Sequence, residues 1–170
     1  MMCGITGTPG TGKSAIGNEL ASRGHTVVHL SDTVGPYVTG EDEKRDARII
    51  DIDRWVADFV PVEGFVEGHF AHLLPCDRIV VLRCRPDVLK TRLAMRKYRE
   101  QKIRENAEAE ALDVCLIETV EDYEPDQILE IDTTEKSPAD CAGIIEGFVQ
   151  GKIPAGFGTL DWSGYLEVTS

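Results

Sequence analysis

The 170-residue sequence predicts an α/β domain with a five-stranded parallel sheet covered by helices. Two observations support this fold class. Short apolar segments typical of buried strands alternate along the chain with segments of helical periodicity, as in the strand–helix units of parallel sheets. A glycine-rich loop at residues 7–14 (GTPGTGKS) lies directly between the first such strand and the first helix. The length predicts one domain over residues 1–150, followed by a C-terminal tail over 151–170.

The loop at 7–14 matches G-x-x-x-x-G-K-S, the pattern of the phosphate-binding loop in P-loop NTPases. Apolar residues before it predict a buried strand, and residues 14–21 after it have helical spacing. Glycines let backbone N–H groups surround phosphate oxygens, and the helix offers its positive end to the same anion. We expect Lys13 to bridge the terminal phosphates of ATP and the Ser14 hydroxyl to bind Mg²⁺.

The composition is acidic, with 18 Lys and Arg against 30 Asp and Glu and a net charge of −12. This balance argues against direct nucleic-acid binding over the whole surface. No apolar run reaches membrane-spanning length and no signal peptide is visible, so we expect a cytoplasmic protein without a membrane anchor. The cysteines are odd in number and form no C-x-x-C pair, which predicts free, buried thiols at Cys3, Cys76, Cys84, Cys115 and Cys141.

Residues 25–30 (HTVVHL) predict a second strand, and Asp32 follows its carboxyl end. In open α/β sheets, ligands bind at that end of the strands. Asp32 is therefore a candidate for the acceptor or Mg²⁺ side of a site. A helix N-cap is an equally good interpretation of the same residue.

Residues 33–50 are polar and read as irregular, because glycines and a proline interrupt them. Such an insertion suits a mobile substrate-binding flap, in which Lys44, Arg45 and Arg48 could meet a phosphate. A solvated charged face is the alternative for each of these cations. After the insertion, residues 51–60 have the apolar spacing of a helix that packs on the sheet.

Residues 62–69 predict a third strand that ends in Glu67-Gly68-His69. An acid at the end of an apolar strand is the second motif of P-loop proteins, where it holds Mg²⁺, often through water. The usual residue is Asp, so Glu67 is a longer substitute. By strand alternation His69 is expected on the same side as Glu67. It could orient water or the γ-phosphate, or it could be a hydrogen-bonded core histidine.

Residues 79–84 predict a central strand, and Pro86 begins the following helix. A cluster of cations then departs from the acidic composition. It could close over nucleotide phosphates as a lid, or it could pair with acids on its own helix surface. For one or two of the arginines we favour the lid interpretation. The cations are Lys90, Arg92, Arg96, Lys97, Arg99, Lys102 and Arg104.

The last third of the chain predicts a long helix over 103–123, a fifth strand over 128–132 and a helix from 138 to about 149. The tail over 151–170 is rich in glycine and carries several large apolar residues. They predict docking on the body of the protein or on a partner, and both interpretations stay open. These residues are Phe157, Leu160, Trp162 and Tyr165.

A phosphate loop with a polar insertion after strand two and a basic segment after strand four resembles a small nucleoside monophosphate kinase. The order GTPGTGKS, an acid-x-His motif and the segment 93–110 is similar to the adenylate kinase isoenzyme six family of archaea and eukaryotic nuclei. The most specific part is the segment 93–110, with Arg96-Lys97-Tyr98, Lys102, Glu105-Asn106, Glu108 and Glu110.

The resemblance covers about residues 2–150 and implies several residue roles. Arg96 resembles the lid arginine that touches ATP, within a lid at about 95–105. Residues 31–50 resemble the region that binds the nucleoside monophosphate. Glu67 and His69 resemble the family's Asp-x-His motif, in which the longer acid puts direct metal coordination in doubt. The implied phosphate-loop contacts are Gly10, Gly12, Lys13, Ser14 and Ala15.

The reaction implied is phosphoryl transfer from ATP to AMP, in which Lys13, Ser14 with Mg²⁺ and lid arginines act by positioning and charge stabilisation. The acceptor phosphate is already an anion, so no strong base is required. The family also hydrolyses ATP in small-ribosomal-subunit maturation, for which Glu67 and His69 could position water. The partner implied is a basic platform protein of that subunit. Two alternatives stay open: an assembly ATPase with secondary kinase activity, and a P-loop kinase for another small metabolite.

Overall fold

The computed structural model describes residues 1–166, and its centre is a parallel sheet with strand order β2-β5-β1-β6-β7. All neighbouring strands in this sheet run parallel, so the carboxyl ends of the strands meet at one edge. The predicted five-stranded parallel sheet is therefore confirmed. Its strands are β1 (Met2–Gly7), β2 (Val27–His29), β5 (Gly64–Glu67), β6 (Arg78–Arg83) and β7 (Ile128–Asp132).

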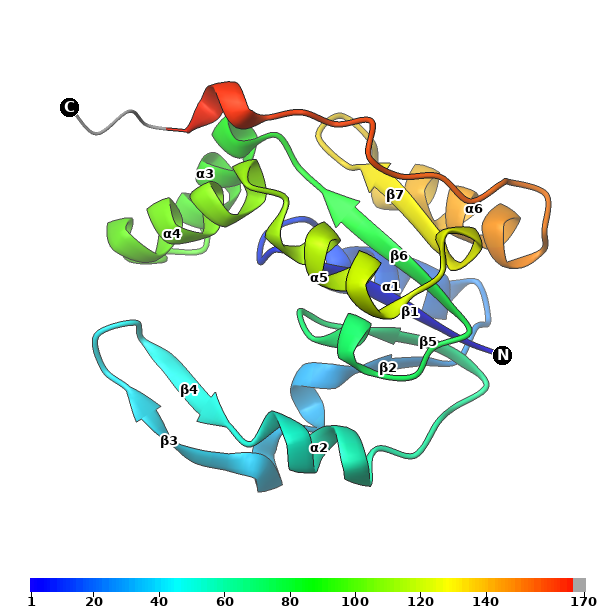
Figure 1. Ribbon diagram of the computed structural model, residues 1–170, viewed down its shortest axis with the longest axis horizontal. Coiled ribbons are helices and arrows are strands. Elements are labelled where there is room, and N and C mark those ends of the chain that lie inside the picture. Colours follow the sequence, from blue (N-terminus) through cyan, green and yellow to red (C-terminus); the bar gives the residue numbers. More distant parts are fainter. Residues whose placement is uncertain (167–170) are drawn as a thin grey trace.

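Helices cover both faces of this sheet, and a separate two-stranded hairpin extends from it (Figure 1). In Figure 1 the hairpin and the helices α3 and α4 lie on the same side of the molecule, beyond the carboxyl edge of the sheet. The helices are α1 (Lys13–Ser22), α2 (Ile52–Asp58), α3 (Pro86–Met95), α4 (Glu100–Ala111), α5 (Val114–Asp122) and α6 (Pro138–Val149). Short 3-10 turns lie at Leu30–Asp32, Gly35–Tyr37, Ala71–Leu73, Pro125–Gln127 and Ser163–Tyr165.

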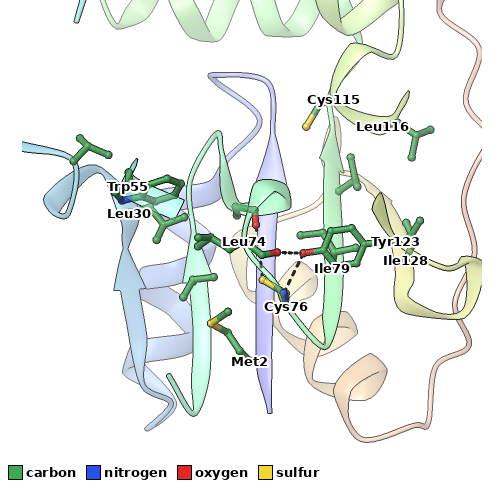
Figure 2. Close-up of a cluster of buried hydrophobic side chains, with 14 residues drawn as sticks. Met2, Leu30, Trp55, Leu74, Cys76, Ile79, Cys115, Leu116, Tyr123 and Ile128 are labelled. Atoms are coloured by element: carbon green, nitrogen blue, oxygen red, sulfur yellow. Dashed lines mark hydrogen bonds between the residues drawn. The ribbon is translucent and has the colours of Figure 1, made fainter. Parts of the chain in front are cut away.

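The two faces of the sheet carry two separate hydrophobic clusters, because successive strand residues point to opposite sides. In β6, Ile79 and Val81 face the cluster that includes residues of α2 and α5, whereas Val80 and Leu82 face the one under α1 and α6. Figure 2 shows the first cluster, in which the Tyr123 hydroxyl donates to the Leu74 carbonyl. Burial of both strand faces explains why the central strands are continuous apolar runs.

The predicted irregular insertion is wrong in part, because residues 38–50 contain an antiparallel hairpin of β3 (Val38–Asp42) and β4 (Ala47–Ile50). The turn has a local cause. The Asp42 side chain accepts hydrogen bonds from the backbone N–H groups of Lys44 (3.1 Å) and Arg45 (3.3 Å), which is typical of turns that begin with Asp. Asp46 then takes a left-handed conformation with φ 50°.

The single helix predicted over 103–123 is also wrong, since it consists of α4 and α5 with a break between them. Asp113 at the break has φ 58°, a left-handed conformation that ends the helical path. Its carboxylate is held by Arg83 at 2.5 Å. The predicted strand 62–69 is shorter than expected, and β5 ends at Glu67. His69 lies in the turn that follows, so strand alternation does not decide its direction.

The C-terminal tail lies on the body of the protein up to the last described residues. Gly156 bridges to Leu129 of β7 in parallel, and Trp162 is buried. Residues 167–170 of the predicted tail lie outside the described residues. All five cysteines are free and buried, as predicted. Within residues 1–166, no helix combines the length and apolar character needed to cross a bilayer.

Candidate functional site

The loop at 7–14 has the backbone conformation that a phosphate-binding loop requires. Gly10 and Gly12 take positive φ values of 92° and 107°, a region that glycine occupies without strain. A Cβ at Gly10 would also lie 2.8 Å from Leu89 of α3 and 2.9 Å from Leu93, so the loop packs tightly against that helix. α1 begins at Lys13, which directs its N-terminus toward the loop.

Lys13 folds back across the loop instead of extending into solvent. Its Nζ donates to the carbonyl oxygens of Gly7 at 2.8 Å and Thr8 at 3.1 Å. Withdrawal from water lowers the pKa of Lys13 to about 8, and the Arg96 guanidinium acts in the same direction, against the nearby Glu67 carboxylate. A bound phosphate would supply the negative charge that favours the ammonium form. The ammonium form of Lys13 and an anion bound at the loop would therefore stabilise each other.

Glu67 lies at the end of β5 beside the loop, and neighbouring side chains fix its carboxylate. The strand register places His29 of β2 opposite Glu67, and the His29 Nδ1 donates to the Glu67 Oε1 at 2.5 Å. The Ser14 hydroxyl lies 3.4 Å from the same oxygen. A Cβ at Gly17 would come within 3.1 Å of the Glu67 Cγ, so this glycine leaves room for the acid that is longer than Asp.

The donors at this edge fit a magnesium ion. Mg²⁺ prefers hard oxygen ligands and usually takes only one or two from the protein, together with water and substrate phosphates. A hydroxyl and a carboxylate lie side by side here, next to the phosphate loop, as Ser14 and Glu67. These two residues would hold the ion. His29 was missed by sequence reasoning, although its position at the end of a strand on the ligand side was a usable signal.

His69 lines the same pocket as Lys13 and Glu67. Its Nδ1 donates to the Gly7 carbonyl at 3.1 Å, which fixes the ring against the loop. His69 keeps part of its surface accessible. Protein atoms nevertheless surround its ring, and this desolvation, together with the Lys13 ammonium, lowers the pKa of His69 below its ordinary value. A neutral imidazole next to the loop is therefore available to orient a polar group.

Two pockets open on the two sides of the loop and share Gly10, Gly12 and Arg96 in their walls. The first has a volume of about 270 Å³ and contains Lys13 and Ser14. Its far wall comes from the hairpin, α2 and the segments after β2 and β5: Leu30, Ser31, Val34, Arg48, Ile50, Trp55 and Phe70. The second lies between α1, α3 and the segment after β7, with Ala15, Arg92, Met95, Thr133, Lys136 and Pro138.

The structure brings most of the predicted site residues together, but not all of them. Arg48 and Arg96 line the first pocket with the loop residues and with Glu67 and His69. Asp32 is exposed in a 3-10 turn, and Arg45 is exposed in the turn of the hairpin. Neither is among the residues that line the pocket.

The predicted lid cations divide into different roles. Arg92 has a structural contact, since it donates to the carbonyl of Thr133 at 2.9 Å. Arg99 and Lys102, at the start of α4, reach across to the hairpin and donate to the carbonyl oxygens of Glu43 (3.4 Å) and Asp46 (3.1 Å). The start of α4 and the turn of the hairpin are thus linked by these two side chains.

Comparisons with known proteins agree with this geometry. A protein-family model described as an AAA domain matches residues 3–113. The chain is 41% identical over 169 residues to a protein of Natronomonas pharaonis named "Putative adenylate kinase", with 98% of this chain and 100% of that protein covered. A protein of Archaeoglobus fulgidus with the same name is 41% identical over 174 residues, which cover 98% of this chain and 94% of that protein.

Solved structures share the fold at low identity. The YorR protein of Bacillus subtilis, in complex with phosphorylated GDP, has a TM-score of 0.61 at 14% identity, over 88% of this chain and 96% of its own. A gluconokinase of Sinorhizobium meliloti has a TM-score of 0.56 at 16% identity, over 89% and 93%. The P-loop kinase fold is thereby confirmed. By the family-model match and its identity to the Natronomonas and Archaeoglobus proteins, the chain belongs to the AAA-domain family and to the family of those two proteins.

Proposed function

We propose that this protein is an adenylate kinase, a nucleoside monophosphate kinase that converts ATP and AMP into two ADP. The observation that carries the proposal is the pair of pockets that meet at Gly10, Gly12 and Arg96. Two nucleotides, one in each pocket, would bring their phosphates together at the loop. The relatives named above support adenylate as the acceptor.

In the proposed reaction, a phosphate oxygen of AMP attacks the γ-phosphorus of ATP while the bond to the β–γ bridging oxygen breaks. The acceptor oxygen is already an anion, so the chain's residues act by positioning and by stabilising charge. Lys13 contacts the phosphates from the loop, and Arg96 lines both pockets. Arg48 lines the first pocket, in which we place AMP as the acceptor. Ser14 and Glu67 would hold Mg²⁺, which would supply charge neutralisation for the transferred phosphate.

The direct test is ADP formation from ATP, AMP and Mg²⁺ by wild-type protein and by Lys13→Ala. We expect AMP-dependent ADP formation, and a loss in kcat/KM of about 100-fold or more in the variant, because a preorganised cation in the site is removed. Lys152→Ala, an exposed lysine beyond α6, is the matched control and should behave as wild type. Wild-type turnover by Lys13→Ala would contradict the assigned site.

A second set of acceptors separates adenylate kinase from a kinase of another small metabolite. Wild-type protein is offered AMP, other nucleoside monophosphates and small hydroxyl acceptors such as shikimate, each with ATP. The proposal requires AMP to give the highest kcat/KM. A higher kcat/KM for a hydroxyl acceptor would contradict an adenylate kinase and favour a kinase of another small metabolite. Such a kinase needs a base to accept the proton of the hydroxyl.

We also propose that the protein is a member of the adenylate kinase isoenzyme six family, hydrolyses ATP and acts in the cytoplasm on the small ribosomal subunit. The segment 93–110 and the placement of His69 beside the loop support this proposal. The net charge of −12 suits a basic ribosomal-protein partner. ATP hydrolysis is measured without AMP, with and without a purified basic platform protein. Stimulation by that protein supports the role, and an unchanged rate contradicts it.

A further inference from the structure

A buried acidic residue outside both pockets reaches the phosphate loop. Glu110, in the last turn of α4, is 1% exposed and its carboxylate receives three hydrogen bonds. The Thr8 hydroxyl donates to Oε2 at 2.5 Å, and Oε1 accepts from the Arg83 Nε at 2.6 Å and from the Cys84 N–H at 3.2 Å. The carboxylate thus joins the loop to the end of β6 and to α4.

Thr8 connects the Glu110 carboxylate to Lys13 through its own hydrogen bonds. Its side chain is held by Glu110, while its carbonyl accepts from the Lys13 Nζ at 3.1 Å. The same carbonyl also accepts from the Thr11 hydroxyl at 2.8 Å and the Thr11 N–H at 3.2 Å. A change in the orientation of Thr8 would therefore shift Lys13 and the turn of the loop together.

The Glu110 carboxylate is paired with a buried guanidinium. Arg83 is also 1% exposed and binds the carboxylates of Glu110, Asp113 at 2.5 Å and Glu130 at 2.7 Å. The Trp162 ring of the tail covers the guanidinium at 5.0 Å. Buried charges persist only where they are paired and hydrogen-bonded, and hydrogen bonds to an ionised acceptor are stronger than neutral ones. The cluster therefore gives Thr8 a strong and fixed acceptor.

We propose that Glu110 is a positioning residue for the phosphate loop and acts through the Thr8 hydroxyl to fix the loop conformation that presents Lys13 to ATP. The inference rests on the proposed function in that it requires ATP to bind at this loop. It assigns Arg83 and the tail residue Trp162 a supporting role, because they stabilise the ionised carboxylate. Neither residue lines either of the two pockets.

The test compares Thr8→Val, which removes the hydroxyl at nearly constant volume, with Thr8→Ser, which retains it. Thr119→Val is the matched control: Thr119 is buried in α5, and its hydroxyl donates to the Cys115 carbonyl of the same helix at 2.7 Å. The dissociation constant for ATP, the KM for AMP and the melting temperature are measured for each protein. Glu110→Gln, which removes the charge, is measured in parallel.

We expect Thr8→Val to weaken ATP binding about tenfold or more, since a buried hydrogen bond to a charged group is lost. Thr8→Ser should restore most of the affinity, the KM for AMP should stay unchanged, and Glu110→Gln should weaken ATP binding in the same way. Equal ATP affinity of Thr8→Val, Thr8→Ser and Thr119→Val, with only a lower melting temperature, would overturn the inference. Wild-type protein that fails to bind ATP would instead overturn the proposed function, and the inference with it.

Discussion

The two sides of the first pocket are built in different ways. The loop side, residues 7–14 with the ends of β1 and β5, rests on buried side chains whose polar groups are paired with one another. The hairpin side, β3 and β4 with the start of α4, is mostly exposed. Its two parts are linked by long side chains from the start of α4 that reach backbone carbonyl groups of the hairpin.

The difference implies that the loop side is preformed, whereas the hairpin side can change its conformation. Buried, fully paired groups resist rearrangement, so the loop can present its donors to phosphate without reorganising. Exposed elements with few buried contacts open at low free-energy cost, which suits a segment that must admit and release an acceptor. Substitutions that remove buried pairs should therefore have larger effects than substitutions on the hairpin side.

Breaking the buried ion cluster should give the largest effect. Arg83→Leu leaves the Glu110 and Glu130 carboxylates buried without their counterion, and removal of one partner of a buried pair costs about 3–5 kcal/mol of the free energy of unfolding. Urea unfolding measures it. Arg85→Ala, two residues away, is the matched control because its pair with Asp87 is exposed and should change the unfolding midpoint little. Equal destabilisation by both changes would show that the buried cluster beneath the loop is no firmer than an exposed ion pair.

The same contrast explains which parts of the fold could be predicted from the sequence. The bounds of β7 and of α6 were predicted correctly, because an apolar run and a proline at the helix start are local signals. Ser137 adds a side-chain cap, in which its hydroxyl accepts from the Asp140 N–H at 3.1 Å. The phosphate loop is equally local, since all its glycines and its lysine are contiguous.

The parts that were missed depend on partners distant in the chain. Neither strand of the hairpin contains a buried residue, so no apolar alternation marked it. The break at Asp113 and the role of Glu110 depend on Arg83, thirty and twenty-seven positions away. One signal was available: an arginine within an apolar central strand requires a buried acidic partner. The contact of His29 with Glu67 required the register of β2 on β5.

The pH dependence of nucleotide binding tests the state of the loop lysine. The pKa of Lys13 is lowered to about 8, so below pH 8 the free protein carries the ammonium and binds phosphate without taking up a proton. Above pH 8 the amine is neutral and binding must recruit a proton, so ATP affinity should fall by up to about tenfold per pH unit.

Titration calorimetry at pH 7, 8 and 9, in buffers with different ionisation enthalpies, measures both the affinity and the proton uptake. Proton uptake should be small at pH 7 and approach one at pH 9. Lys13→Arg is the control, because a guanidinium keeps its proton over this range and should remove the dependence. An affinity that does not change between pH 7 and pH 9 in wild-type protein would contradict a lowered pKa of Lys13.

On the hairpin side, Arg48→Ala should act on the acceptor alone. Arg48 lines the first pocket from β4, so its loss should raise the KM for AMP about tenfold, the effect of one charge-assisted hydrogen bond, and leave ATP affinity unchanged. Steady-state kinetics with each substrate varied in turn measure both quantities. Lys44→Ala, in the exposed turn of the same hairpin, is the control. A larger change in ATP affinity than in the KM for AMP would show that Arg48 contacts ATP and would contradict the prediction.

The smallest effect is expected where the lid meets the hairpin. Arg99 donates to the Glu43 carbonyl over 3.4 Å in an exposed position, so Arg99→Ala should leave the free energy of unfolding within about 1 kcal/mol of wild type. The contact joins the start of α4 to the hairpin that lines the first pocket, and we expect its removal to change kcat by about twofold to threefold by making the opening of these elements easier. Arg104→Ala, whose pair with Glu100 stays within α4, is the control. If Arg99→Ala instead changed unfolding as much as Arg83→Leu, the hairpin side would be as firmly built as the loop side.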